Sequence, residues 1–282
     1  MVPEPVITES SHGMEDGVDL REKALRGIGL QSSYVYGPVS SRRLGLSLGI
    51  NPLPVTVKVC SFDCLYCQYG LEKPTGPRGG LSEALFPMVS AILAELEEVL
   101  KRYPGKIDFL TFSGNGEPTL HPRFFELVEG TVAIRDRLRP ESRIALLSNG
   151  STIADDDVRA AIRLLDDPIL KLDAGDEASW KIINRPAMGM HLEAIVSAME
   201  KLKNIIIQSL FFEGDGARIA GNTSAGAVQK WLSCVERIRP RSVQIYTLDR
   251  VPAISGLRKA KEETLRAILA ALEGRGIKGV IF

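Results

Sequence analysis

Apolar residues along the chain fall into short blocks that alternate between two spacings. The block at 107–112 is a compact apolar run typical of a buried strand, whereas residues 124–138 place apolar side chains three or four positions apart, as a helix does. The same alternation continues to the C-terminus. It predicts strands at 144–147, 169–172, 205–212, 243–247 and 277–282, and helices at 155–165, 191–202, 225–238 and 262–272.

Further elements precede this series. Apolar residues at every second position from 44 to 50 predict a half-buried strand, and Val55, Val57 and Val59 repeat that pattern. A helix is predicted to begin near Pro87, because proline suits the first turn of a helix. Residues 1–33 are polar and weakly periodic, which predicts a flexible N-terminal segment ahead of one domain at 34–282.

Strands that alternate with helices of this length require right-handed βαβ crossovers and therefore a parallel sheet. About six such units predict an α/β fold, a partial (β/α)6 barrel of parallel strands that is open on one side. In sheets of this kind the chemistry lies at the carboxyl ends of the strands. Residues that follow the predicted strands are therefore the first candidates for a site.

Composition and charge argue against several classes of protein. The net charge is +0, so no global field draws the protein toward nucleic acid or anionic lipid. The N-terminus lacks the apolar region of a signal peptide, and no apolar run has the length of a membrane span. We predict a cytoplasmic protein with no membrane partner. The three histidines, His12, His121 and His191, are isolated in the sequence and are predicted to be structural.

Three of the four cysteines lie within eight residues, at Cys60, Cys64 and Cys67. Three soft thiolates in one loop can bind three irons of a 4Fe–4S cube and leave the fourth iron open to a small molecule. Zinc is the alternative, but it normally takes four ligands, and no nearby Cys or His completes a set. Cys234 lies in a helical apolar pattern and is predicted to be a buried structural thiol.

Candidate polar residues follow the 107–112 strand directly, at Gly114, Asn115, Gly116 and Glu117. Glycine allows a close approach of the backbone to a ligand, and the Glu117 carboxylate can accept hydrogen bonds from an ammonium group. A tight turn with no ligand is the alternative interpretation.

Later strands also end in polar residues. Ser148 and Asn149 can hydrogen-bond a ribose or a carboxylate, or can cap a turn. Lys171 and Asp173 share one face of their strand, where they form either a ligand clamp or a buried ion pair. Gln208 is polar inside an otherwise apolar strand, where a core would prefer no polar group.

The spacing of Cys60, Cys64 and Cys67, with Tyr66 just before the last cysteine, resembles the signature of the radical S-adenosylmethionine (SAM) superfamily. Further segments are similar to the radical SAM Fe–S oxidoreductases related to the enzymes of wybutosine synthesis. These segments are Ser-Arg-Arg-Leu-Gly at 41–45, Ser-Gly-Asn-Gly-Glu-Pro-Thr at 113–119, Lys-Leu-Asp-Ala at 171–174, Ile-Asn-Arg-Pro at 183–186 and Tyr-Thr-Leu-Asp-Arg at 246–250.

This resemblance implies one 4Fe–4S cluster on the three clustered cysteines, with SAM on the open iron. It implies reductive cleavage of SAM to a 5′-deoxyadenosyl radical, which abstracts hydrogen from a substrate that the sequence does not identify. An external donor of the flavodoxin or ferredoxin type would supply the electron. The residues expected to contact SAM are Tyr66, Gly114, Asn115, Gly116, Glu117, Ser148, Asn149, Lys171, Asp173 and Gln208.

A separate set is predicted on the substrate side: Arg42, Arg43, Asn184, Arg185 and Arg250. Guanidinium groups at an open barrel mouth favour planar anions, because they make paired hydrogen bonds to phosphate or carboxylate. The predicted substrate is therefore anionic, and a nucleotide or RNA is favoured. Pairing of these arginines with structural acids is the alternative for the residues themselves.

Three other functions remain as alternatives. One is a peptide- or protein-modifying radical SAM enzyme. The second is an iron–sulfur redox protein that does not use SAM, although the polar motifs after successive strands favour SAM binding. The third is a zinc-stabilised RNA-binding module, which the neutral charge and the missing fourth ligand disfavour.

Overall fold

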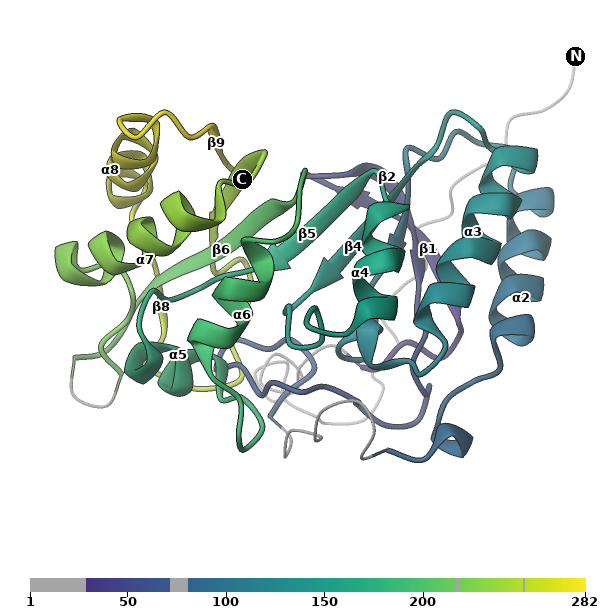
Figure 1. The fold of residues 1–282 in the computed structure, drawn as a ribbon, viewed down its shortest axis with the longest axis horizontal. Coiled ribbons are helices and arrows are strands. Elements are labelled where there is room, and N and C mark those ends of the chain that lie inside the picture. Colours follow the sequence, from purple (N-terminus) through teal and green to yellow (C-terminus); the bar gives the residue numbers. More distant parts are fainter. Residues whose placement is uncertain (1–28, 72–80, 217–218, 251) are drawn as a thin grey trace, which may run out of the picture.

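The computed structural model of the chain describes residues 29–71, 81–216, 219–250 and 252–282. Nine strands in this part of the chain form one sheet, with α-helices along one side of it (Figure 1). The strands are β1 (Val35–Ser41), β2 (Gly45–Ile50), β3 (Phe109–Phe112), β4 (Arg143–Ser148), β5 (Asp167–Lys171), β6 (Ile206–Glu213), β7 (Ser242–Thr247), β8 (Arg258–Lys259) and β9 (Gly279–Ile281).

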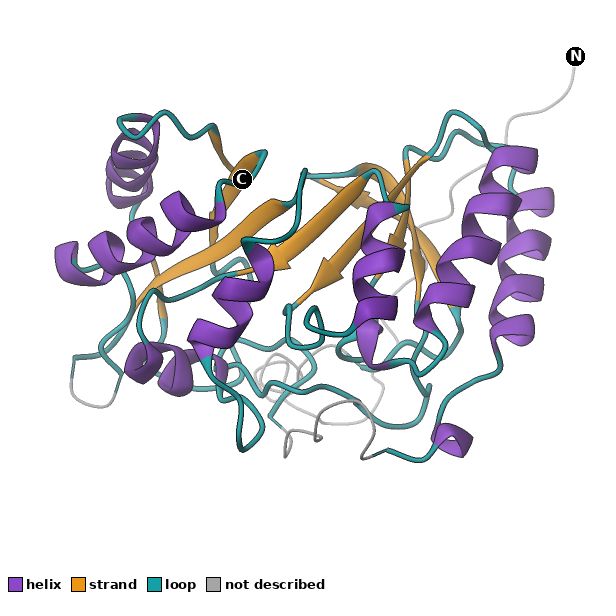
Figure 2. Ribbon diagram, viewed as in Figure 1, coloured by secondary structure: helices purple, strands orange, loops and turns teal. Residues whose placement is uncertain are grey.

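The helices alternate with these strands, as the hydrophobic pattern predicts. They are α2 (Val89–Arg102), α3 (Phe124–Leu138), α4 (Asp156–Arg163), α5 (Glu177–Asn184), α6 (Leu192–Met199), α7 (Ala225–Ile238) and α8 (Glu262–Glu273), with short 3-10 turns η1 (Glu83–Leu85) and η2 (Pro118–Leu120). Figure 2 shows α2, α3 and α4 side by side in front of the sheet.

Strand order in the sheet follows the chain from β1 to β7 and ends with β9, while β8 pairs only with β6. The pairs from β2 to β7, and β7 with β9, are parallel; β1 is antiparallel to β2. From β2 to β7, each strand is followed by a helix, which gives six units. This arrangement confirms the predicted α/β fold, a partial barrel with parallel strands and free edges at β1 and β9.

The two faces of the sheet contribute to different apolar clusters. Residues such as Leu146 and Ile207 belong to the large apolar core shared with the helices. Their neighbours in the strands face the inside of the barrel, where Ala145 and Ile206 pack in a small cluster with Leu44. Leu44 comes from the turn between β1 and β2, so this turn reaches the inner face of the barrel.

Polar side chains on the inner face are paired with one another. The hydroxyls of Ser47 and Thr111 lie 2.7 Å apart, and Gln208 donates a hydrogen bond of 2.9 Å to Gln244. All four residues are buried. The inner face of the barrel therefore provides a polar lining below the carboxyl ends of the strands.

One predicted strand is absent from the described structure, and two elements of the structure were not predicted. Val55, Val57 and Val59 are not in a strand; Val59 makes only an isolated bridge, and that prediction is wrong. Pro52 and Pro54 directly precede these valines, and the Asn51 side chain bonds both backbone groups of Leu53, so the chain turns before it reaches Val55. Strand β1 was not predicted because Gly and Pro interrupt its sequence. Helix α5 was not predicted because it is only eight residues long.

Residues 1–28 of the predicted flexible segment lie outside the described residues. Among the helices that the structure describes, none is long and apolar enough to cross a membrane.

Candidate active site

The cysteine loop at 60–67 is held in place by the end of helix α5. The backbone amide of Asp63 donates to the carbonyl of Asn184 at 3.1 Å, and the amide of Leu65 donates to the carbonyl of Ile183 at 3.0 Å. These bonds fix the backbone between the first and last cysteines. The segment at 183–186, which was predicted as part of the substrate side, therefore supports the cysteine loop.

The glycine-rich turn after β3 packs against the other end of the cysteine loop. The amide of Val59 donates to the carbonyl of Asn115, and the amide of Glu117 donates to the carbonyl of Val59, each at 2.9 Å. A Cβ atom on Gly116 would lie 1.9 Å from the Val59 carbonyl oxygen, and Gly116 has a φ of 142°. Glycine is needed here because the two backbones touch.

The carboxylate of Glu117 is buried and joins the segment after β3 to the end of β4. Its Oε1 accepts hydrogen bonds from the Thr119 hydroxyl at 2.6 Å and the Ser148 hydroxyl at 2.8 Å, and its Oε2 accepts from the Asn149 amide at 2.6 Å. Burial raises the pKa of Glu117 above its usual value, although these donors act in the opposite direction. Oε2 accepts this one bond and retains a free lone pair for a ligand.

A cavity of about 240 Å³ lies at the carboxyl ends of the strands, and we call it the thiol cavity because Cys60, Cys64 and Cys67 all line it. Most of the predicted SAM contacts line the same cavity: Tyr66, Gly114, Gly116, Glu117, Ser148, Asn149, Lys171 and Gln208. Two predicted contacts do not. Asn115 is buried and bonds Gln31 and Pro54, and Asp173 lies behind Lys171.

The thiols suit an iron–sulfur cluster. The side-chain amide of Asn149 lies 3.7 Å from the Cys60 sulfur, and that of Asn184 lies 3.4 Å from the Cys64 sulfur. Both amides donate to sulfur, and such hydrogen bonds stabilise bound thiolates and influence the potential of a cluster. Within the described ranges, no three His, Cys, Asp or Glu side chains gather closely enough to hold a single metal ion. A cube offers each thiolate its own iron, so this spread is compatible with it.

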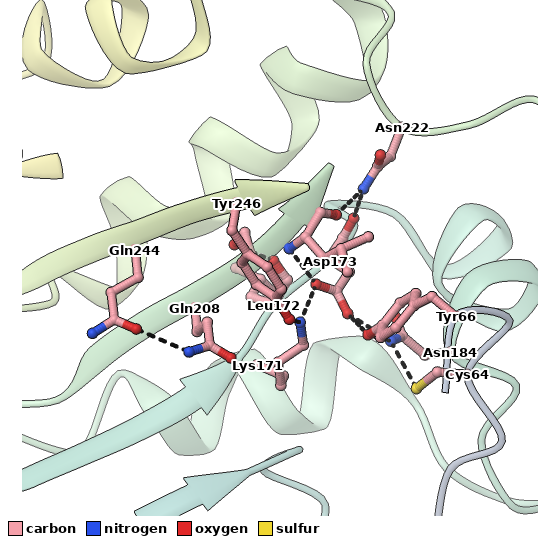
Figure 3. A network of polar contacts seen from close by, with 12 residues as sticks. Cys64, Tyr66, Lys171, Leu172, Asp173, Asn184, Gln208, Asn222, Gln244 and Tyr246 are labelled. Carbon is pink, nitrogen blue, oxygen red and sulfur yellow. Dashed lines mark hydrogen bonds and ion pairs between the residues drawn. The ribbon is translucent and has the colours of Figure 1, made fainter. Parts of the chain in front are cut away.

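A buried network links the cysteine loop to β5 and β7 (Figure 3). The ammonium of Lys171 lies 2.9 Å from Asp173 and donates to the hydroxyl of Tyr246 at 2.6 Å. Burial alone would lower the pKa of Lys171, but Asp173 and Tyr246 raise it above its usual value. Asp173 also accepts hydrogen bonds from Tyr66 and Asn184. The predicted clamp residues therefore form a buried ion pair, with Lys171 at the cavity wall.

A second cavity, of about 270 Å³, lies beside the first and shares Tyr66, Gln68 and Tyr246 with it. We call it the arginine cavity, because the described residues of its lining include Arg42, Arg43 and Arg250 and a single acid, Asp249. These positions come from opposite ends of the sheet. The turn that carries Arg42 and Arg43 meets the segment after β7 across the open side of the barrel.

The arginines of this cavity differ in their partners. Arg42 forms an exposed ion pair of 3.0 Å with Asp249, and Arg250 donates to Gln68 at 2.9 Å. Arg43 lies over the ring of Tyr246, 4.6 Å from its centroid, and its Nη1 is buried with no hydrogen-bond partner among the described residues.

The remaining two predicted substrate residues lie elsewhere. Asn184 is buried beside Cys64, and neither Asn184 nor Arg185 lines the arginine cavity. Arg185 ends α5 in a left-handed conformation and lies 3.5 Å from Asp63.

Sequence reasoning missed several residues of the thiol cavity. Lys58 is almost fully buried two positions before Cys60, and Gln68 and Tyr69 follow the last cysteine. Lys58 could have been recognised from the sequence, because it is a charged residue between Val57 and Val59 in an apolar segment. No sequence signal indicated that Tyr246 would separate two cavities, because its neighbours come from distant parts of the chain.

Comparison with known proteins agrees with the fold and the cysteine loop. The model of the radical SAM superfamily matches residues 55–215, which is more than half of the chain. The chain therefore belongs to the radical SAM superfamily. It is a radical SAM enzyme, and membership implies a 4Fe–4S cluster at Cys60, Cys64 and Cys67 together with SAM.

Two proteins of known sequence are similar to this chain over most of its length. The chain is 34% identical to the UPF0026 protein of Methanocaldococcus jannaschii, over 84% of this chain and 70% of that protein. It is also 31% identical to a protein named GTPase Obg from Brachyspira hyodysenteriae, over 78% of this chain. The chain spans only 31% of the length of that Brachyspira protein.

Solved structures share the fold at low sequence identity. A radical SAM methyltransferase from Sphaerobacter thermophilus has a TM-score of 0.60 at 13% identity, over 84% of this chain and 65% of that one. The wybutosine-synthesis enzyme TYW1, with a lysine–pyruvate adduct bound, has a TM-score of 0.54 at 16% identity, over 81% of this chain and 73% of that one. The predicted relation to the wybutosine group is thus confirmed for the fold.

Proposed function

We propose that this radical SAM enzyme modifies a phosphate-bearing substrate, a nucleotide or a segment of RNA, which binds in the arginine cavity while SAM occupies the thiol cavity. The two cavities share Tyr66, Gln68 and Tyr246, so ligands in them would be direct neighbours. Hydrogen transfer between two bound molecules requires this proximity.

The observation that carries the proposal is the buried Nη1 of Arg43, which has no hydrogen-bond partner in the part of the chain that the structure describes. A buried N–H group without a partner costs about 1–3 kcal/mol, and an anion in the cavity would remove that cost. Burial lowers the pKa of Arg43 below its usual value, so the charged side chain also gains from a negative ligand. Phosphate suits the site because it accepts paired hydrogen bonds from a guanidinium group.

The chain's own residues bind and orient the cofactor in this proposal. Oε2 of Glu117 would accept a hydrogen bond from the SAM amine, and Lys171, which lines the same cavity, would bind the SAM carboxylate. Gln208 lies in the floor, where the adenine would rest. When bound, the cluster and SAM supply a carbon radical that removes a hydrogen atom from the substrate. A flavodoxin- or ferredoxin-type protein is the proposed electron donor.

The test is a screen for stimulation of SAM cleavage. The reconstituted enzyme is incubated anaerobically with dithionite and SAM, and cell extract is separated into small-molecule, RNA and protein fractions. We expect the small-molecule or RNA fraction to stimulate formation of 5′-deoxyadenosine. Phosphatase should abolish stimulation by a nucleotide, and nuclease should abolish stimulation by RNA. Stimulation by the protein fraction alone would contradict the proposal.

A variant of Arg43 connects this result to the cavity. Loss of a charge-assisted hydrogen bond of about 1.5–3 kcal/mol should raise the half-stimulating concentration of the active fraction about ten- to a hundredfold in Arg43→Ala. Arg102→Ala is the matched control, because Arg102 is exposed at the end of α2, away from the residues that line either cavity, and pairs with Glu98. Equal behaviour of the two variants would remove the arginine cavity from the proposal.

A further inference from the structure

Lys58 places a buried ammonium group in the wall of the thiol cavity. Its side chain is 3% exposed, and its Nζ lies 3.3 Å from Asp63 and donates to the carbonyl of Gly70 at 2.8 Å. Lysine is almost never buried to this degree unless it is paired. The lysine therefore crosses the cysteine loop, from the residue before Cys64 to the segment after Cys67.

Among the described residues, the group around Asp63 carries more positive than negative charge. Asp63, whose side chain is 2% exposed, is approached by Lys58 and also by Arg185, at 3.5 Å. Two cations and one carboxylate give this group a net charge of one positive unit (1 + 1 − 1). Burial of charge is costly unless an opposite charge answers it. Cys60 and Cys67 line the same cavity as Lys58, and as thiolates holding a cluster they would supply negative charge there.

We propose that Lys58, assisted by Arg185 and opposed by Asp63, is an electrostatic positioning residue that sets how readily the cluster on the three cysteines is reduced. A one-electron reductant, such as a flavin or iron–sulfur protein, adds negative charge to a group already held by three thiolates. Positive charge in a region of low dielectric constant favours that gain. The inference concerns the cofactor and does not depend on the identity of the substrate.

Two substitutions break the same ion pair with opposite changes of charge. Lys58→Gln removes a positive charge beside the cluster, and Asp63→Asn removes a negative one. The measurement is an anaerobic redox titration of each reconstituted protein, followed by electron paramagnetic resonance. At a fixed potential, we expect the ratio of reduced to oxidised cluster to fall about tenfold in Lys58→Gln and to rise by a similar factor in Asp63→Asn. Tenfold corresponds to about 59 mV for one electron.

The opposite signs separate this role from a structural one. If the ion pair only holds the loop, both variants should lose cluster while the potential of the remaining cluster stays unchanged, or both should shift it in the same direction. Either result would overturn the proposal. Lys58→Arg keeps the charge and should restore the ratio to within about threefold.

Arg185→Gln gives a second test that leaves Lys58 in place, because Arg185 is 44% exposed and lies 3.5 Å from Asp63. We expect the ratio of reduced to oxidised cluster to fall two- to threefold in this variant. An unchanged ratio in Arg185→Gln would contradict the proposal even if Lys58→Gln holds no iron.

Discussion

The thiol cavity and the arginine cavity share a wall, yet their polar groups are in different states. In the thiol cavity, the carboxylate of Glu117 accepts bonds from three neighbouring residues, and Lys171 has two partners. In the arginine cavity, Arg43 keeps a buried nitrogen without a partner, and the side chain of Arg42 is 59% exposed. Among the described residues, the polar groups of the first cavity are already paired, whereas the second keeps a buried cationic group that the proposed anionic substrate would pair.

The largest effect is expected from substituting the metal ligands that line the thiol cavity. Replacing Cys60, Cys64 or Cys67 by Ala should abolish the cluster, because a cube held by three protein ligands cannot lose one without exposing a second iron. Iron and sulfide analysis of each reconstituted variant checks this. Full iron occupancy in the triple Ala variant would show that the cluster lies elsewhere.

A smaller effect, still confined to the thiol cavity, is expected at Glu117. Glu117→Ala should weaken SAM binding about ten- to a hundredfold, because a charge-assisted hydrogen bond contributes roughly 1.5–3 kcal/mol. Calorimetric titration of the reconstituted protein with SAM measures the change. The iron content should be retained. If SAM affinity is unaltered, Glu117 only joins the strand ends through Ser148 and Asn149.

Tyr246 lines both cavities, and its substitution tests which of the two depends on its hydroxyl. Tyr246→Phe keeps the ring beneath Arg43 but removes the hydroxyl that holds Lys171. Loss of one neutral acceptor is worth about 0.5–1.5 kcal/mol, so SAM affinity should fall about two- to tenfold. Stimulation by the substrate fraction should need the same concentration as in the wild type. A change in that concentration alone would place the function of Tyr246 in the arginine cavity.

The smallest effect is expected outside both cavities, at Cys234. This thiol is buried in α7 and lies 3.6 Å from the carbonyl of Gly175. Cys234→Ala should keep the full iron content and reduce the free energy of unfolding by no more than about 1.5 kcal/mol. Thermal unfolding and iron analysis measure both quantities. Loss of about half the iron would reveal a second cluster site.

The sequence predicted the elements whose pattern is local. Helices α3 and α7 have the predicted bounds, because their apolar positions follow one period throughout. The cysteine loop was predicted because three ligand residues lie within eight positions. In contrast, β1 carries Gly and Pro and has no clear apolar alternation, so its pairing with β2 could not be read from propensity.

Long-range contacts explain what the sequence did not reveal about the site. Arg42 and Arg43 belong to the turn before β2, far from β7 in the sequence, and they reach Asp249 and Tyr246 across the open barrel. Arg185 was grouped with them because it follows β5, yet it supports the cysteine loop. Spacing along the chain cannot distinguish these cases, since each depends on how the barrel curves.

SAM cleavage under dithionite tests the central claim most directly, namely that the thiol cavity holds the cluster and SAM together. The wild-type protein and Cys234→Ala, each reconstituted to about four irons per chain, are incubated with SAM, and 5′-deoxyadenosine and methionine are quantified. We expect equal amounts of the two products from both proteins, and neither product from Cys60→Ala. A wild-type protein that carries its full cluster and leaves SAM intact would contradict the claim.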